Sequence, residues 1–212
     1  MKKCILMALF LLAAVFLLAG CRTETIVYGD NINTADTAVI FYPGGKVDPG
    51  AYGQLLEMVA DQGIPVIVAR MPLNLAILHG SAASDILKEY PEVDHWILAG
   101  HSLGGYMASE WVAKHSGSAD GLILLAAYPT KEIPVPVLSI YGSADGVMKR
   151  DKYENGMKMI PSLEEHVIEG GNHCQFGDYG LQKGDGEASI SRTQQMETAA
   201  ALMVSFIRTV TQ

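Results

Sequence analysis

The pentapeptide Gly100-His101-Ser102-Leu103-Gly104 follows an apolar run, HWILA at residues 95–99, and opens an amphipathic stretch that extends to residue 114. A short, continuously apolar run is typical of a buried strand, and the next stretch has the apolar spacing of a helix. The glycines lack a Cβ, so the chain can turn sharply from strand to helix and project the Ser102 side chain above the sheet. The sequence therefore predicts a strand–turn–helix unit with an exposed serine hydroxyl, a candidate nucleophile.

The same alternation continues on both sides of this unit. Apolar runs predict further strands at residues 37–42, 64–69, 122–126, 135–141 and 165–168. Apolar residues at helical spacing predict helices at residues 51–62, 81–89, 152–159 and 193–210. Buried strands that alternate with amphipathic helices are typical of a parallel sheet covered on both faces. We expect an α/β fold with a mostly parallel sheet of about six to seven strands.

Composition limits the classes of protein that the chain can be. Its 212 residues are enough for one ordinary globular domain. Hydrophobic residues make up 49% and charged residues 18%, so the signature of a disordered chain is absent. The net charge is -8 and no basic cluster is present, which makes nucleic acid an unsuitable partner.

The N-terminus has the pattern of an export signal. Met1-Lys2-Lys3 is followed by an apolar run at residues 5–18 and then by Leu18-Ala19-Gly20-Cys21. This ending resembles the lipobox of bacterial lipoproteins, which implies a signal peptide at residues 1–20 and a diacylglyceryl group on Cys21. A transmembrane helix is the alternative, but the run is shorter than the ~20 apolar residues that a bilayer needs.

We therefore expect an exported protein of the bacterial cell envelope, held to the membrane by its lipid. Residues 21–36 are polar and mixed, and we interpret them as a tether that includes at most one edge strand. The globular domain is expected at residues 37–212. If Cys4 leaves with the signal and Cys21 carries lipid, Cys174 has no partner, so no disulfide is expected.

From the serine turn onward, nearly all of residues 37–210 resembles the α/β-hydrolase superfamily. The resemblance implies an α/β-hydrolase fold and a catalytic triad in the chain order serine, acid, histidine. Asp145 follows an apolar strand and a glycine, as the family's acid does, and Asp151 is the alternative. His173 lies in the glycine-rich turn after the last predicted strand and matches the family's base. The remaining histidines suit structural roles better: His79, His95, His101, His115 and His166.

An acyl-transfer site also needs N–H donors for the oxyanion that forms during the reaction. The backbone N–H of Leu103, at the start of the predicted helix, is one candidate. The second should come from the loop Pro43-Gly44-Gly45-Lys46, where proline stands in the place of the histidine that the family often has. Gly45 is the first choice for this donor and Lys46 the next.

The resemblance implies a small serine hydrolase, a carboxylesterase that cleaves small esters through an acyl-enzyme on Ser102. Dienelactone-hydrolase-like proteins are similar in size but carry cysteine at the turn, so serine favours oxygen esters. A thioesterase, a lipase or a peptidase could use the same triad. An inactive hydrolase fold that serves as a surface-binding lipoprotein is the alternative outside enzymes.

Only about eight residues separate the strands predicted at 122–126 and 135–141, so we expect no lid domain and an open site. The predicted mechanism uses no cofactor. Residues 174–187 faintly resemble a calcium loop, but their ligand spacing does not match one, and we predict no metal. The sequence leaves the oligomeric state open. Candidate pocket walls are Tyr42, Met71, Leu73, Tyr106 and Tyr128.

Overall fold

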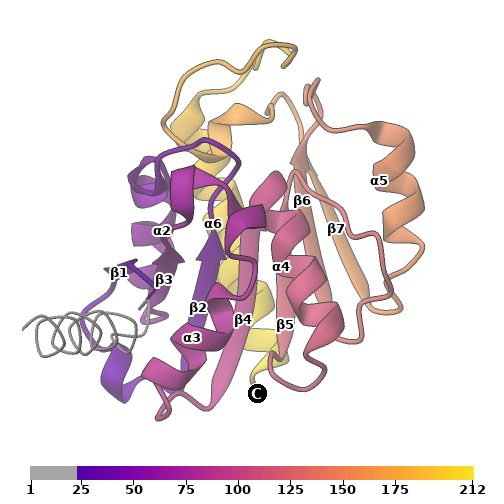
Figure 1. Cartoon of the computed structure of the whole chain (residues 1–212). Helices are drawn as coiled ribbons and strands as arrows, with labels where there is room; N and C mark the ends of the chain where they lie inside the picture. The colour runs from indigo at the N-terminus through magenta and orange to yellow at the C-terminus, as the bar shows by residue number, and fades with distance from the viewer. Residues whose placement is uncertain (1–22) are drawn as a thin grey trace, which may run out of the picture.

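The structure, a computed structural model, describes residues 23–212. Within them the chain forms one seven-stranded sheet in the order β1-β3-β2-β4-β5-β6-β7 (Figure 1). All neighbouring strands are parallel except β1, which runs antiparallel to β3. The strands are β1 (Thr25–Tyr28), β2 (Thr37–Tyr42), β3 (Val66–Ala69), β4 (His95–His101), β5 (Gly121–Leu125), β6 (Val137–Gly142) and β7 (Leu163–Ile168).

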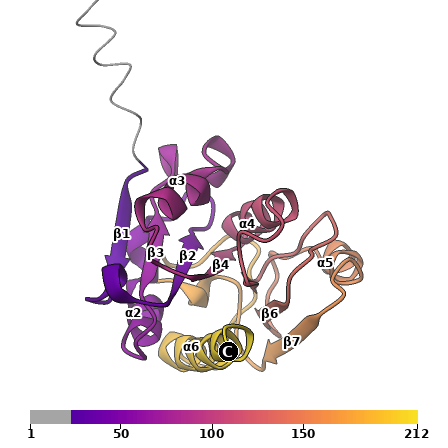
Figure 2. The same ribbon diagram turned by 90° about the horizontal axis from the view of Figure 1, so that it is seen from below.

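Helices cover both faces of the sheet. They are α2 (Gly53–Ala60), α3 (Ala82–Glu89), α4 (Leu103–Lys114), α5 (Arg150–Met157) and α6 (Arg192–Val210). Figure 2 shows α3, α4 and α5 on one face and α2 and α6 on the other. Short 3-10 turns lie at Ile32–Thr34, Pro49–Tyr52, Pro72–Asn74, Ala76–Leu78 and Cys174–Phe176. This confirms the predicted α/β fold with a mostly parallel sheet.

The hydrophobic core is divided by the sheet into two layers. Along β2, Ala38 and Ile40 pack into the layer under α3, α4 and α5, whereas Val39 and Phe41 pack against α2 and α6. All four are fully buried, which explains why the strand is apolar from Ala38 to Phe41. A fully buried Val, Ile or Phe side chain contributes about 1.5–3 kcal/mol relative to an exposed one. Burial on both faces can therefore hold the domain together while Cys174 stays a free, buried thiol.

The N-terminal part of the fold contains the one edge strand that the sequence allowed within the expected tether. Strand β1 lies within residues 21–36 and pairs with β3 from Thr25↔Ala69 to Tyr28↔Val66, so this segment adds an edge strand to the sheet. The predicted signal peptide, residues 1–20, and the predicted lipid site at Cys21 lie outside the described residues. Among residues 23–212, no helix has the length and apolar character needed to cross a membrane.

The connection between β5 and β6 replaces a crossover helix with an irregular segment. The two strands are parallel neighbours with the register Leu122↔Val137, and residues 126–136 join them without a helix. Ile133 of this segment is only 1% exposed and packs into the core layer under α3, α4 and α5. The segment lies against the sheet, so within the described residues the predicted absence of a lid holds.

The strand order places a crevice at the carboxyl edge of the sheet. From β2 the chain moves outward to β3, and it then returns to form β4 on the other side of β2. Ligands of open α/β sheets bind at such a reversal, outside the carboxyl ends of the strands. The loops that follow β4, β6 and β7 bring Ser102, Asp145 and His173 to this edge.

Candidate active site

Ser102 occupies a strained turn between β4 and α4. Its backbone angles are φ 53 and ψ -121, which a residue with a side chain rarely adopts. A Cβ at Gly100 would lie 2.7 Å from the carbonyl carbon of Gly104, and a Cβ at Gly104 would overlap the carbonyl oxygen of Tyr42. Gly100 therefore lets the start of α4 lie close to the end of β4, and Gly104 lets it lie close to the end of β2. The hydrogen bond from Ser102 N to Leu125 O, 2.9 Å long, fixes the turn on β5.

Backbone strain is concentrated at the edge of the sheet that carries Ser102. Within residues 23–212, the five non-glycine residues with positive φ all lie in loops that follow β2, β3, β4 or β5. They are Lys46, Leu73, Asn74, Ser102 and Ala126. Such strain costs stability and persists where the surrounding structure enforces it, which is common at functional sites. It marks this edge as the candidate site independently of the serine motif.

His173 and Asp145 form a buried pair. The His173 Nδ1 lies 2.8 Å from Asp145 Oδ2, and the two side chains are 1% and 0% exposed. The other carboxylate oxygen, Oδ1, accepts hydrogen bonds from the N–H groups of Val147 and Met148 at 2.9 and 2.8 Å. Both oxygens of the buried carboxylate are thus satisfied. Because Asp145 accepts at Nδ1, the His173 ring is held in one orientation with Nδ1 protonated.

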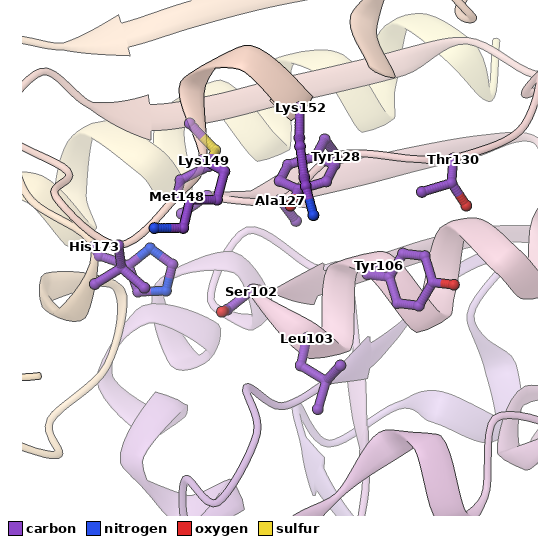
Figure 3. A pocket seen from close by; sticks show the side chains of 12 residues that line it. Ser102, Leu103, Tyr106, Ala127, Tyr128, Thr130, Met148, Lys149, Lys152 and His173 are labelled. Atoms are coloured by element: carbon purple, nitrogen blue, oxygen red, sulfur yellow. The ribbon is translucent and has the colours of Figure 1, made fainter. Parts of the chain in front are cut away.

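The second ring nitrogen of His173 is free to act. Its Nε2 is buried and has no hydrogen-bond partner among the described residues. Figure 3 shows the Ser102 hydroxyl pointing to the side of the pocket on which the His173 ring lies. Both residues line one pocket of about 380 Å³. Its other lining residues are Leu103, Tyr106, Ala126, Ala127, Tyr128, Thr130, Val147, Met148, Lys149 and Lys152.

Backbone N–H groups are available beside Ser102. Leu103 is the first residue of α4, where amide groups have no partner inside the helix. In the loop after β2, the Gly44 N–H donates to the Tyr52 hydroxyl and the Lys46 N–H donates to the Asn74 carbonyl. Gly45 lies between them and its N–H donates to no other described residue, whereas Lys46, the second choice, is already engaged. A Cβ at Gly45 would be 2.9 Å from the Leu103 side chain, so the two candidate donors are neighbours.

His101 joins the loops of the site through a buried network that the sequence did not predict. Its Nε2 lies 3.0 Å from the His173 carbonyl oxygen, which can only accept, so Nε2 carries the proton. Its Nδ1 lies 2.8 Å from the Tyr52 hydroxyl, which donates to it and also accepts from the Gly44 N–H. Burial lowers the pKa of His101 well below its usual value, and the nearby His173 ring lowers it further. A neutral His101 thus connects the loops after β2, β4 and β7.

Asp185 joins the loops that carry the acid and the base. Its carboxylate accepts hydrogen bonds from the backbone N–H groups of Gly146, His173 and Cys174 at 2.9–3.2 Å. Burial of this side chain raises its pKa, but the backbone N–H groups outweigh that effect and leave the pKa below its usual value. Among residues 23–212, no group of three or more potential metal ligands gathers anywhere. Asp185 belongs to residues 174–187, which faintly resemble a calcium loop, but its carboxylate binds backbone N–H groups.

The other predicted residues have mixed outcomes. Of the expected pocket walls, Tyr106 and Tyr128 line the pocket, but Tyr42 and Met71 are buried in the core and Leu73 is 82% exposed. Asp151, the alternative acid, is exposed in the first turn of α5. The structure brings Asp145 to His173 instead. The remaining histidines lie near other partners: His79 by Asp85, His95 by Asp120, His115 by Trp111 and His166 by Glu164.

The comparisons with known proteins agree with this architecture. Residues 38–197 match the model of the alpha/beta hydrolase family, which covers most of the chain. The chain belongs to the alpha/beta hydrolase family. No curated protein sequence matches it.

Solved structures with the same fold include several enzymes at low sequence identity. The monoacylglycerol lipase of Paleococcus ferrophilus superposes with a TM-score of 0.67 at 14% identity, over 86% of this chain and 98% of the lipase. Est1E of Butyrivibrio proteoclasticus, solved with ferulic acid, superposes with a TM-score of 0.68 at 14% identity, over 88% of this chain and 94% of Est1E. Esterase 2 of Thermogutta terrifontis, phosphoramylated by tabun, superposes with a TM-score of 0.65 at 15% identity, over 86% of this chain and 89% of the esterase. At these identities the likeness concerns the fold.

Proposed function

We propose that this protein is a serine hydrolase that cleaves small carboxylic esters through an acyl-enzyme on Ser102. The observation that carries the proposal is the state of His173. Its Nδ1 is fixed by the buried Asp145 carboxylate, and its Nε2 has no partner and shares a pocket with the strained Ser102. A serine hydroxyl is a weak nucleophile until such a base takes its proton.

In the acylation step, His173 Nε2 removes the Ser102 proton while Oγ attacks the ester carbonyl carbon. The negative charge that develops on the carbonyl oxygen is stabilised by the N–H groups of Leu103 and Gly45. The imidazolium is stabilised by Asp145 and then gives its proton to the departing alcohol. His101 stays neutral beside it, so it adds no second positive charge to the site.

In the deacylation step, the same groups act on water. His173 Nε2 takes a proton from a water molecule, and the hydroxide attacks the acyl carbon of the Ser102 ester. The tetrahedral intermediate again uses Leu103 and Gly45, and its collapse returns the proton to Ser102 Oγ as the acid leaves. The cycle consumes one water and needs no cofactor.

The solved structures with this fold include a lipase and esterases, and these names agree with an ester substrate. A thioesterase, a lipase or a peptidase would use the same three side chains. The absence of a lid in the described residues favours small substrates over lipid aggregates. A purely binding role would leave the unpartnered, buried Nε2 of His173 without a use.

We expect short acyl chains to be preferred. The pocket opens to solvent without a lid, so a long acyl chain stays partly in water and each exposed CH₂ forgoes up to ~0.8 kcal/mol of burial. The p-nitrophenyl butyrate ester should therefore have a higher kcat/KM than the palmitate ester. The rates are measured below and above the solubility limit of each substrate. A preference for palmitate, or a jump in rate when the substrate aggregates, would identify a lipase instead.

We also propose that the domain is tethered to a membrane through a lipid on Cys21. The support is the lipobox-like sequence that ends at this residue. Expression in a bacterial host should give a processed protein that is extracted from membranes only by detergent. Cys21→Ser should remain unprocessed, because the cysteine is the residue that receives the lipid. If the variant is processed at the same position as the wild type, the motif is accidental.

A further inference from the structure

Two lysines at the rim of the pocket carry an inference about the substrate, which rests on the proposed function. Lys149 and Lys152 line the same pocket as Ser102 and His173. Figure 3 shows both side chains reaching into the space above Ser102 and His173, with their ammonium groups toward the pocket. Lys149 is the N-cap of α5, with an extended backbone, and Lys152 lies in the first turn of the helix, so both belong to the end of α5 that adjoins the pocket.

The position of these lysines is fixed by the residues around them. The Asp145 carboxylate holds the N–H groups of Val147 and Met148, which places the chain immediately before Lys149. Between the lysines, the Arg150 guanidinium lies over the Tyr141 ring, 4.4 Å from its centroid. This contact turns Arg150 away to the sheet side of α5. The start of α5 therefore has a set orientation, and the N-cap Lys149 and the first-turn Lys152 face the pocket.

The positive charge at this rim is not neutralised by the protein. Within residues 23–212, neither lysine takes part in an ion pair. The pocket lining contains no aspartate or glutamate. Glu110, which holds the pocket residue Thr130 by a 3.1 Å hydrogen bond, is itself paired with Lys131 at 2.6 Å.

This arrangement works against the stability of α5. Cations near a helix N-terminus oppose the helix dipole, which Asp151 alone among the first-turn residues complements, and like charges that lie close together repel each other. It also contrasts with the protein as a whole, whose net charge is -8. A local feature that opposes both the helix dipole and the overall charge is expected where function requires it. Here the function that fits is attraction of a negative charge to the mouth of the pocket.

We infer that the preferred substrates are esters that carry a carboxylate near the scissile bond, such as half-esters of short dicarboxylic acids. Lys149 and Lys152 bind the carboxylate while the ester carbonyl lies at Ser102. Because both ammonium groups are exposed, their attraction is screened by water and salt, and the preference is moderate.

The test compares an anionic ester with a neutral ester of the same chain length. Monoethyl succinate and ethyl pentanoate are chemically stable, and their hydrolysis is followed in a pH-stat. The measured quantity is the ratio of kcat/KM for the anionic ester to kcat/KM for the neutral ester. For the wild type at low ionic strength, we expect this ratio to be about five or more. In Lys149→Gln/Lys152→Gln the ratio should fall to about one or below. Added sodium chloride should lower the ratio of the wild type and leave that of the double variant unchanged.

A matched control is Lys88→Gln/Lys158→Gln, which removes the same charge from two exposed lysines outside the pocket. It should keep the wild-type ratio. Suppose that the neutral ester is cleaved. If the kcat/KM ratio of the wild type is then one or less, or if Lys149→Gln/Lys152→Gln keeps the wild-type preference for the anionic ester, the inference is overturned and the proposed esterase stands. If neither ester is cleaved and a fluorophosphonate does not label Ser102, the proposed function fails and the inference fails with it.

Discussion

Ser102→Ala should reduce the turnover of p-nitrophenyl butyrate by about 10⁵–10⁶-fold, which is the scale of loss when the nucleophile of a catalytic triad is removed. The alanine has no oxygen to form the acyl-enzyme, while the N–H groups of Leu103 and Gly45 remain and leave a small residual rate. The fold should survive, because Ser102 makes its structural hydrogen bond with the backbone N–H and its side chain is only partly buried.

Ser116→Ala is the matched control. This serine is exposed after the end of α4 and distant from the pocket lining, so its variant should keep the wild-type kcat. Circular dichroism and the thermal midpoint of unfolding would show that both variants are folded. A Ser102→Ala protein that is folded and still turns over ester at a wild-type rate would exclude Ser102 as the nucleophile.

Asp145→Asn should lower kcat by about 10⁴-fold with the fold intact. The asparagine Oδ1 can still accept from the N–H groups of Val147 and Met148, so the loop after β6 keeps its shape. Its amide nitrogen would then occupy the place of Oδ2 and donate to His173 Nδ1. That donation forces the proton onto Nε2, and the ring can no longer act as a base toward Ser102.

The same substitution at the alternative acid separates the two candidates. Asp151→Asn changes an exposed carboxylate on α5, and we expect its kcat to stay within about twofold of the wild type, as for most surface substitutions. Both variants are measured with p-nitrophenyl butyrate at saturating concentration. A large loss in Asp151→Asn with a small loss in Asp145→Asn would mean that the acid has been assigned to the wrong residue.

Much of the fold could be predicted because the five inner strands, β2 to β6, are buried on both faces. Strand β2 has the predicted limits, and the glycine-flanked Ser102 stands at the predicted turn. The N-terminal edge strand was harder to predict, because Thr25–Tyr28 is only partly buried and its neighbours are polar. Whether such a segment joins a sheet depends on its pairing with β3, which local sequence does not encode.

The catalytic residues could be predicted from the chain order serine, acid, histidine of the resembling family. The residues that line the pocket could not, because packing determines which side chains face it. Asp145 and His173 could be chosen because each follows a strand at the same edge of a parallel sheet. Tyr42 ends β2 and Met71 follows β3, yet both pack into the core, since residues at a strand end can point to either face. Lys149 and Lys152 could not be assigned to the pocket, because the predicted helix at residues 152–159 leaves Lys149 outside and the sequence does not show what the start of that helix covers.

Covalent labelling tests the proposed chemistry most directly. The wild-type domain is incubated with a fluorophosphonate, digested, and its peptides are mapped by mass spectrometry. We predict one adduct per chain, on Ser102, and we predict that Asp145→Asn slows its formation because the serine is no longer activated by His173. No adduct on the folded wild type, or an adduct on another residue with Ser102 unmodified, would contradict a serine-hydrolase mechanism at this site.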